Sequence, residues 1–274
     1  PSAEVHAARL TGRLASLVNG TAKYLPVPGV VGSAESVRVL FACEAGSRAW
    51  GFPSADSDYD VRFLYLRPTG WYLTIDPGRD VIERPIDANL DITGWDLKKA
   101  LLLLRKSNPP LMEWLNSPII YWEQTSAAAR MRALAPVFHI PAMSARHYLR
   151  MAQRSWAEYQ SKGASLKMLF YSLRALLAVS WIEQDFGVAP TEFSRLLDRL
   201  IADSSLRGSI EVLMAVKAGG AEKDSAGEVG QVVGFIQAEL ARREAQPALT
   251  GGSTGNSGDL DRIFRDLLRE VWNT

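Results

Sequence analysis

The chain has 274 residues, of which 47% are hydrophobic and 22% charged, and its formal net charge is +1. This composition is typical of a globular protein with one large or two modest cores, and it excludes the strong basic excess of proteins that hold nucleic acid through phosphates alone. No run approaches the ~18 consecutive apolar residues of a membrane helix, and the single cysteine excludes an internal disulfide. We therefore expect two domains in a cytoplasmic protein.

The first predicted elements lead to a sharp turn. An amphipathic helix is predicted over residues 5–18 and a turn-rich segment over 19–36. The apolar, β-prone run 37–43 predicts a buried strand that ends close to Gly46, where the chain can turn sharply. Ser47 then opens a short predicted helix, where its hydroxyl can accept from backbone N–H groups or touch phosphate. An open helix N-terminus also favours an anion.

The next predicted strand, residues 58–66, carries two carboxylates on one face. Period-two alternation places Asp58, Asp60 and Arg62 together, opposite the face of Tyr59. Two acids so close repel each other unless a cation lies between them, and a pair of Mg²⁺ ions can bridge carboxylates and phosphates. The alternative is a solvated Asp-rich turn, which is the commoner reading of Asp-X-Asp alone. The Gly-Ser turn that ends the preceding strand favours the metal site.

These motifs carry a family resemblance. Residues 44–51 (EAGSRAWG) followed by 57–63 (SDYDVRF) are similar to the signature of the DNA polymerase β-like nucleotidyltransferase superfamily, and in particular to its RlaP/YcgL-like branch. The resemblance continues through 94–101 (GWDLKKAL), 107–109 (SNP), 113–115 (EWL) and 117–118 (SP). It implies an α+β fold, with a polymerase β-like palm built from a mixed sheet and helices and followed by an all-α C-terminal helical domain.

The resemblance also implies a third acid on a neighbouring strand. Asp91 lies in a polar–apolar alternation typical of a half-buried strand and is our choice, with Asp87, two pleats earlier on the same face, in reserve. Asp96 begins the helical run 97–106, where capping explains it. We thus predict Asp58, Asp60 and Asp91 as catalytic residues and ligands of a two-ion Mg²⁺ or Mn²⁺ site, with an NTP as substrate.

A second set of residues is predicted to bind the nucleotide. Gly46 and Ser47 would hold its phosphates, and Arg48 and Arg62 are phosphate contacts unless they pair with Glu44 or Asp56. Further along, residues 164–186 predict a helix that is apolar nearly all round, yet three polar residues recur on it at i, i+4 and i+7. Buried polar groups need partners. Either a nucleotide between the domains supplies them or an interdomain salt bridge does, for Lys167, Tyr171 and Arg174.

The chain changes character near residue 123. We predict a nucleotidyltransferase catalytic domain over 1–122 and an all-α domain over 123–274 that completes the cleft for nucleotide and acceptor. Within the second domain, Arg146, Arg150 and Arg154 recur every four residues. They form either an exposed face paired with carboxylates or a track for a polynucleotide. Further helices are predicted over 144–160, 192–202, 206–217, 228–245 and 260–273.

The predicted reaction is metal-dependent transfer of an NMP from an NTP to an acceptor hydroxyl with release of pyrophosphate. The family resemblance favours an RNA end as the acceptor, as in RNA repair. Two alternatives stay open: nucleotidylation of a protein or small-molecule hydroxyl, and a catalytically silent nucleotide-binding or interaction module.

Overall fold

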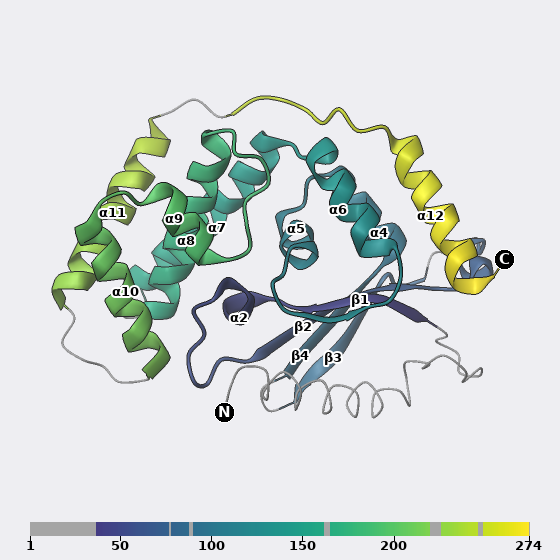
Figure 1. Cartoon of the computed structure of the whole chain (residues 1–274), viewed down its shortest axis with the longest axis horizontal. Coiled ribbons are helices and arrows are strands. Elements are labelled where there is room, and N and C mark those ends of the chain that lie inside the picture. The colour runs from purple at the N-terminus through teal and green to yellow at the C-terminus, as the bar shows by residue number, and fades with distance from the viewer. Residues whose placement is uncertain are drawn as a thin grey trace.

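The computed structural model describes residues 37–76, 78–87, 90–161, 165–219, 226–245 and 249–273. The helix and the turn-rich segment predicted over 5–36 lie outside these residues. The described chain is α+β, as predicted: a mixed sheet with helices is followed by a helical lobe (Figure 1).

The sheet has five strands in the order β3-β4-β2-β1-β5. Strands β2 and β4 pair in parallel, and the other neighbours are antiparallel. The strand bounds are β1 Arg38–Glu44, β2 Tyr59–Leu66, β3 Val81–Asp87, β4 Leu90–Asp96 and β5 Ile120–Glu123. The strands predicted over 37–43 and 58–66 are therefore confirmed as β1 and β2.

Side chains of β2 alternate between two cores, as the sequence pattern predicts. Phe63 and Tyr65 belong to a small core on one face, whereas Leu64 and Leu66 lie in a larger core on the other. That larger core is covered by helices α4, α5, α6 and α12, of which Figure 1 shows α4, α6 and α12 above the sheet. The helix bounds on this side are α2 Gly46–Trp50, α3 Thr69–Tyr72, α4 Leu97–Arg105, α5 Pro109–Leu115, α6 Ala127–Phe138 and α12 Ser257–Trp272.

Asp96 caps α4, as predicted. Its Oδ1 accepts from the backbone N–H of Lys98 at 2.8 Å, and its Oδ2 accepts from the Tyr72 hydroxyl at 2.6 Å. The capping bond uses one of the first N–H groups of the helix, which have no partner within it. Asp96 is therefore a structural residue away from the two acidic positions of β2.

The remaining helices build a second lobe with its own core. Their bounds are α7 Pro141–Ser161, α8 Leu166–Glu183, α9 Phe193–Leu200, α10 Ser204–Gly219 and α11 Ala226–Glu244. Trp50 and Phe52, from the turn after β1, insert into this core. The Phe52 ring stacks on Phe170 with ring centroids 5.3 Å apart and meets Phe193 edge-on. The turn after β1, which carries Trp50 and Phe52, therefore anchors the helical lobe to the sheet.

The two cores do not divide at residue 123. Helices α6 and α12 both lie beyond that position, yet they bury their apolar faces on the sheet beside α4. Helical periodicity shows that a helix buries one face, but it does not show which layer receives that face. The helical lobe of the described chain thus runs from α7 to α11.

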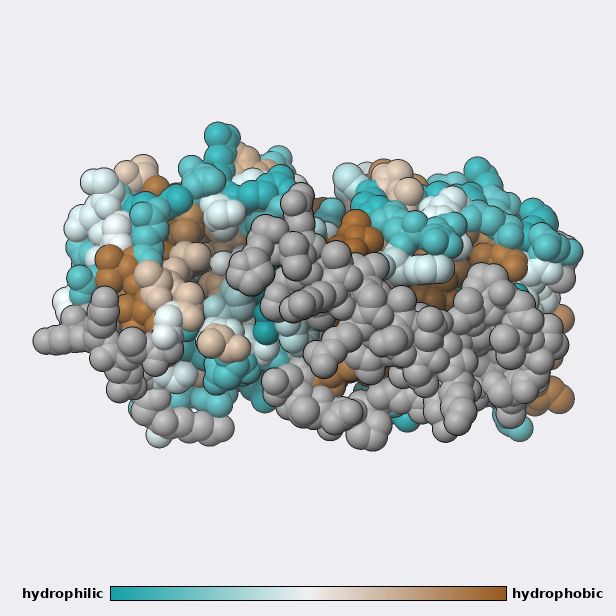
Figure 2. Space-filling view, turned by 60° about the horizontal axis from the view of Figure 1, so that its bottom comes forward, coloured by the Kyte–Doolittle hydropathy of each residue, from teal (hydrophilic) through white to brown (hydrophobic). Residues whose placement is uncertain are grey.

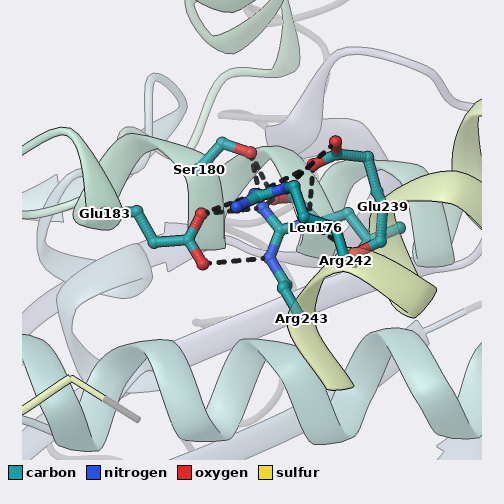
Figure 3. A network of polar contacts seen from close by, with 6 residues as sticks. All are labelled: Leu176, Ser180, Glu183, Glu239, Arg242 and Arg243. Atoms are coloured by element: carbon teal, nitrogen blue, oxygen red, sulfur yellow. Dashed lines mark hydrogen bonds and ion pairs between the residues drawn. The ribbon is translucent and has the colours of Figure 1, made fainter. Parts of the chain in front are cut away.

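A partly buried arginine network joins α11 to α8 (Figure 3). Arg243, whose side chain is only 2% exposed, bonds Glu239 at 2.6 Å, Glu183 at 3.1 Å and the Ser180 hydroxyl at 2.6 Å. Arg242 bonds the same two carboxylates. Guanidinium bonds from both arginines lower the pKa of Glu239 despite its burial. This network ties the C-terminal end of α11 to the C-terminal end of α8.

Hydrophilic residues cover much of the described surface in Figure 2, with hydrophobic residues gathered in separate patches. None of the described helices combines the length and the apolarity that crossing a membrane requires.

Candidate active site

Gly46 lies where β1 gives way to the five-residue helix α2. Its φ of 58° is in the left-handed region, which glycine adopts at little cost. A Cβ atom at this position would lie 2.0 Å from Oδ2 of Asp60. The turn therefore leaves room for the Asp60 carboxylate, and the backbone confirms that two motifs ten residues apart meet in space.

Asp60 and Asp91 are direct neighbours in the parallel pair β2/β4. Nη2 of Arg62 bridges them, at 2.9 Å from Oδ1 of Asp60 and 2.7 Å from Oδ2 of Asp91. The three side chains are 27%, 32% and 16% exposed for Asp60, Asp91 and Arg62, so the cluster is half-buried but reaches solvent. Asp91, the acid predicted on a neighbouring strand, therefore lies beside Asp60.

Asp87 does not lie on the same strand as Asp91, contrary to our expectation. It ends β3, whereas β4 begins at Leu90, and the two strands run antiparallel with Asp87 opposite Leu90. A shared face would require residues 87–92 to form one strand, whereas the boundary between β3 and β4 separates Asp87 from Asp91. Asp91 is the acid that the register places next to Asp60.

The pKa of Asp60 is raised, first by burial and then by the charges of Asp91 and Asp58, while Arg62 and Lys167 lower it. Asp58 is exposed and precedes β2. Hard carboxylate oxygens of this kind suit Mg²⁺, and their mutual repulsion calls for a cation. The donor set thus fits a divalent ion. In the part of the chain that the structure describes, however, no three acidic, histidine or cysteine side chains are already arranged to hold a metal.

Glu44 is a functional candidate that the sequence reasoning passed over. It is fully buried, and its Oε1 accepts from the backbone N–H of Asp60 at 2.7 Å. Its Oε2 accepts from the Tyr121 hydroxyl, and its carbonyl accepts from the Ser117 hydroxyl at 2.6 Å. Burial raises the pKa of Glu44, while the bonds from Tyr121 and Asp60 lower it. Glu44 therefore positions Asp60, and the signal for it was a charged residue at the end of an apolar strand.

Arg48 and Ser47 hold the loop that carries Asp58. Arg48 donates to the carbonyls of Ser57 at 2.6 Å and Asp58 at 3.1 Å, and its guanidinium lies 3.9 Å from the centroid of the Tyr59 ring. The Ser47 hydroxyl, which is largely buried, donates to Ser57 at 3.2 Å. Neither the Glu44 nor the Asp56 pairing considered for Arg48 occurs. As placed, both residues bind the loop, so their predicted phosphate contacts stay predictions.

Two of the three polar residues predicted on α8 face the acids. The Tyr171 ring packs edge-on against Trp50 with centroids 4.9 Å apart. Burial, together with the charges of Asp60 and Asp58, raises the pKa of Tyr171 to about 12. Lys167 is exposed, and its Nζ lies 5.8 Å from the centroid of the Tyr171 ring. Helix α8 therefore forms a wall beside the acids, while the binding of nucleotide by Lys167 and Tyr171 stays a prediction.

Arg174 does not lie in that wall. It is fully buried, with Nη1 3.0 Å from Oε1 of Glu113, and its Nε and Nη2 donate to the carbonyl of Thr191 at 3.3 and 3.0 Å. Glu113 also accepts from Trp50 at 3.0 Å and from the Tyr148 hydroxyl at 2.8 Å. This geometry is the interdomain salt bridge weighed as the alternative, so nothing in it supports nucleotide binding by Arg174. Arg174 keeps the same helix face as Lys167, but it lies two turns further along α8, where α5 and the segment before α9 cover that face.

Lys217 of α10 is a second residue near the site that sequence reasoning missed. Its Nζ donates to the carbonyl of Phe52 at 2.7 Å, and the residue is only 8% exposed. Burial lowers its pKa, as does the charge of Lys167 nearby. No local pattern marked Lys217, because its partner lies far away in sequence.

Comparison with known proteins decides the family. Residues 30–266 match the family model described as "RlaP: RNA repair pathway DNA polymerase beta family". The chain belongs to this family. The resemblance predicted from the motifs around Gly46, Asp58 and Asp60 is thereby confirmed.

Two individual proteins are similar to this member of the RlaP family. The uncharacterized protein YcgL of Bacillus subtilis (strain 168) is 42% identical over 238 residues, which cover 86% of this chain and 92% of that protein. A solved structure of a nucleotidyltransferase-like protein from Exiguobacterium sibiricum 255-15 is 13% identical and covers 94% of this chain and 88% of its own, with a TM-score of 0.33. That structural likeness is too distant to carry an argument about the site.

Proposed function

We propose that this chain transfers an NMP from an NTP to an acceptor hydroxyl and releases pyrophosphate. The observation that carries the proposal is the placement of Asp60 and Asp91 side by side, with the Asp60 carboxylate against the Gly46 turn. Membership of a DNA polymerase β family supports it. In the reaction, the acceptor oxygen bonds to the α-phosphorus, the bond from that phosphorus to the bridging oxygen breaks, and pyrophosphate leaves. We assign to Asp91 the task of taking the hydroxyl proton.

Asp58, Asp60 and Asp91 would hold Mg²⁺ or Mn²⁺. Such ions neutralise the charge that develops on the attacking and leaving oxygens. The chain's own residues supply positioning: Glu44 fixes the Asp60 backbone, and Arg48 fixes the loop before Asp58. Positioning and charge stabilisation account for most catalysis of phosphoryl transfer.

We propose an RNA end as the acceptor. The family's description as an RNA repair pathway supports this choice, and so does the surface of α7. Arg146, Arg150 and Arg154 are all exposed there, and no ion pair joins any of them to a carboxylate in the described parts of the chain. The three arginines of α10 and α11 are, in contrast, all paired. Of the two readings of this stripe, the structure therefore favours the one with unneutralised charge.

The helix that carries these arginines is also fixed against α8, the helix that approaches the acids. The Ser172 hydroxyl of α8 donates to the carbonyl of Ala152 of α7 at 3.1 Å, which fixes the two helices in register. The α7 turns that carry Arg150 and Arg154 are therefore level with the α8 turn that carries Tyr171. An RNA backbone bound along these turns of α7 would lie level, along the helix axes, with Tyr171 on α8.

Replacing Arg146, Arg150 and Arg154 together by Gln should weaken binding of single-stranded RNA and make it less sensitive to salt. Each lost phosphate contact lowers the slope of log K against log salt by about 0.7 for single strands, so three contacts change it by about 2. The measurement is a fluorescence-anisotropy titration at several salt concentrations.

The matched control removes three charges from exposed arginines that do have carboxylate partners: Arg195, Arg262 and Arg269. Replacing these by Gln should leave the salt slope of RNA binding unchanged. If the two triple variants change RNA binding equally, the arginines of α7 are not a specific RNA-binding surface and the effect comes from net charge alone.

A screen of acceptors tests the function itself. The four NTPs, labelled at the α-phosphate, are incubated with Mg²⁺ or Mn²⁺ and with RNA ends, DNA ends, protein or small-molecule hydroxyls. Label on RNA ends supports the proposal, and label on protein or on a small molecule supports the alternative acceptors. Absence of both transfer and pyrophosphate release with every acceptor would support the silent nucleotide-binding module.

A further inference from the structure

Arg62 occupies the place between two carboxylates where a cation is needed. It contacts both acids through Nη2, and its Nη1 donates to the carbonyls of Asp91 at 3.0 Å and Val61 at 3.1 Å. A guanidinium is permanently charged and presents its donors in a fixed fork, so one arginine can hold two strands at once. The strands β2 and β4 are thus joined by this side chain as well as by their backbones.

The electrostatics of the cluster depend on this contact. Burial first, and then the charges of Asp91 and Asp58, raise the pKa of Asp60, and Arg62 is the strongest influence that lowers it. The same two carboxylates are those to which we assign a divalent ion. A metal ion that binds Oδ1 of Asp60 and Oδ2 of Asp91 needs the oxygens that Nη2 of Arg62 now contacts at 2.7–2.9 Å, and a guanidinium and an ion cannot share them. One of them must give way.

We propose that Arg62 is an internal counter-ion, which holds Asp60 and Asp91 together before metal binds and which the divalent ion displaces. Arg62 is thus a positioning residue in the free protein. Once displaced, its guanidinium is available for the phosphate contact that the sequence predicts for it. The inference rests on the proposed function in one respect, namely that these two carboxylates bind the metal.

The structure favours an exchangeable contact over a permanent one. Arg62, Asp60 and Asp91 are all partly exposed, at 16–32% of their side chains, and ion pairs in such settings contribute little free energy. The contrast within this chain is Arg174, whose side chain is completely buried where it pairs with Glu113. A metal ion can therefore displace Arg62 at modest cost.

The experiment is a Mn²⁺ titration of the nucleotide-free protein, in which electron paramagnetic resonance measures the unbound ion. Arg62→Gln should bind Mn²⁺ about ten-fold more tightly than the wild type, because no ion pair has to be broken first. Arg62→Lys should lie between the two, since a single ammonium cannot hold both carboxylates in the same way. Arg79→Gln removes an exposed charge paired with Glu83 and should match the wild type.

A second measurement uses thermal unfolding without and with Mn²⁺. Arg62→Gln should melt at a lower temperature than the wild type in the absence of metal, and Mn²⁺ should raise its melting temperature by more. Combining Arg62→Gln with Asp60→Asn should remove the gain in Mn²⁺ affinity. If Arg62→Gln does not fold, Arg62→Lys decides by the same two readouts.

Equal or weaker Mn²⁺ binding by the Arg62 variants would overturn the inference, since Arg62 would then not compete with the ion. This outcome is distinct from failure of the proposed function. If Mn²⁺ binding depends on Arg62 but no acceptor receives label, the inference about Arg62 stands and the proposed transfer reaction is refuted.

Discussion

Gly46→Ala should reduce nucleotidyl transfer by about 100-fold or more. The new Cβ would lie 2.0 Å from Oδ2 of Asp60, so either that carboxylate or the turn must move. A displacement of about 1 Å at a catalytic group can cost roughly 100-fold in rate. The left-handed φ of 58° adds strain of about 1–2 kcal/mol for a residue with a Cβ. Initial rates of label transfer and urea unfolding measure the two effects separately.

Gly51→Ala is the matched control for this prediction. Gly51 has a φ of 94°, also left-handed, but a Cβ there would meet no atom within 4 Å. The substitution should therefore lower the free energy of unfolding while transfer stays close to the wild-type rate. If both alanine variants transfer label equally well, contact between the Gly46 turn and Asp60 is not needed for the reaction.

Glu113→Leu should lower the free energy of unfolding by about 3–5 kcal/mol, because it leaves the buried charge of Arg174 without its carboxylate partner. The loss includes the bonds that Glu113 accepts from Trp50 and Tyr148. Trp50, Tyr148 and Arg174 come from α2, α7 and α8. Loss of their shared partner should therefore also let the helical lobe separate more easily from the turn after β1. Urea unfolding followed by tryptophan fluorescence measures the change in the free energy of unfolding, and Trp50 at the contact contributes to that signal.

A double-mutant cycle with Arg174→Met separates the ion pair from general packing. Met replaces the guanidinium without a charge, so Glu113→Leu combined with Arg174→Met should be more stable than Glu113→Leu alone. If the losses of the two single variants simply add, the pair contributes no coupling and the contact between the lobes depends on packing of the aromatic residues.

The parts of the molecule that follow from local sequence were predicted well. The alternation in 58–66 identified the two faces of β2, and the spacing between Gly46 and Asp60 indicated that the turn and the carboxylates meet. The capping role of Asp96 followed from its place before a helical run. In each case the physical cause lies within one element or between two consecutive strands.

The parts that depend on distant pairing were not predictable. Glu113 and Arg174 are 61 residues apart and Lys217 lies 165 residues from Phe52, so no local period connects them. The strand boundary between Asp87 and Leu90 was missed because the polar and apolar residues alternate across it. The packing of α12 on the sheet, although α7–α11 intervene, is likewise a property of the assembled layers.

The most direct test of the account compares label transfer from an α-³²P NTP to RNA ends by the wild type and by Asp60→Asn. The substitution keeps the size of the side chain but removes the charge between Gly46 and Arg62. We predict that transfer by Asp60→Asn is abolished, while its circular dichroism spectrum and urea midpoint stay close to those of the wild type. Undiminished transfer by a folded Asp60→Asn protein would contradict the assignment of this carboxylate to the reaction.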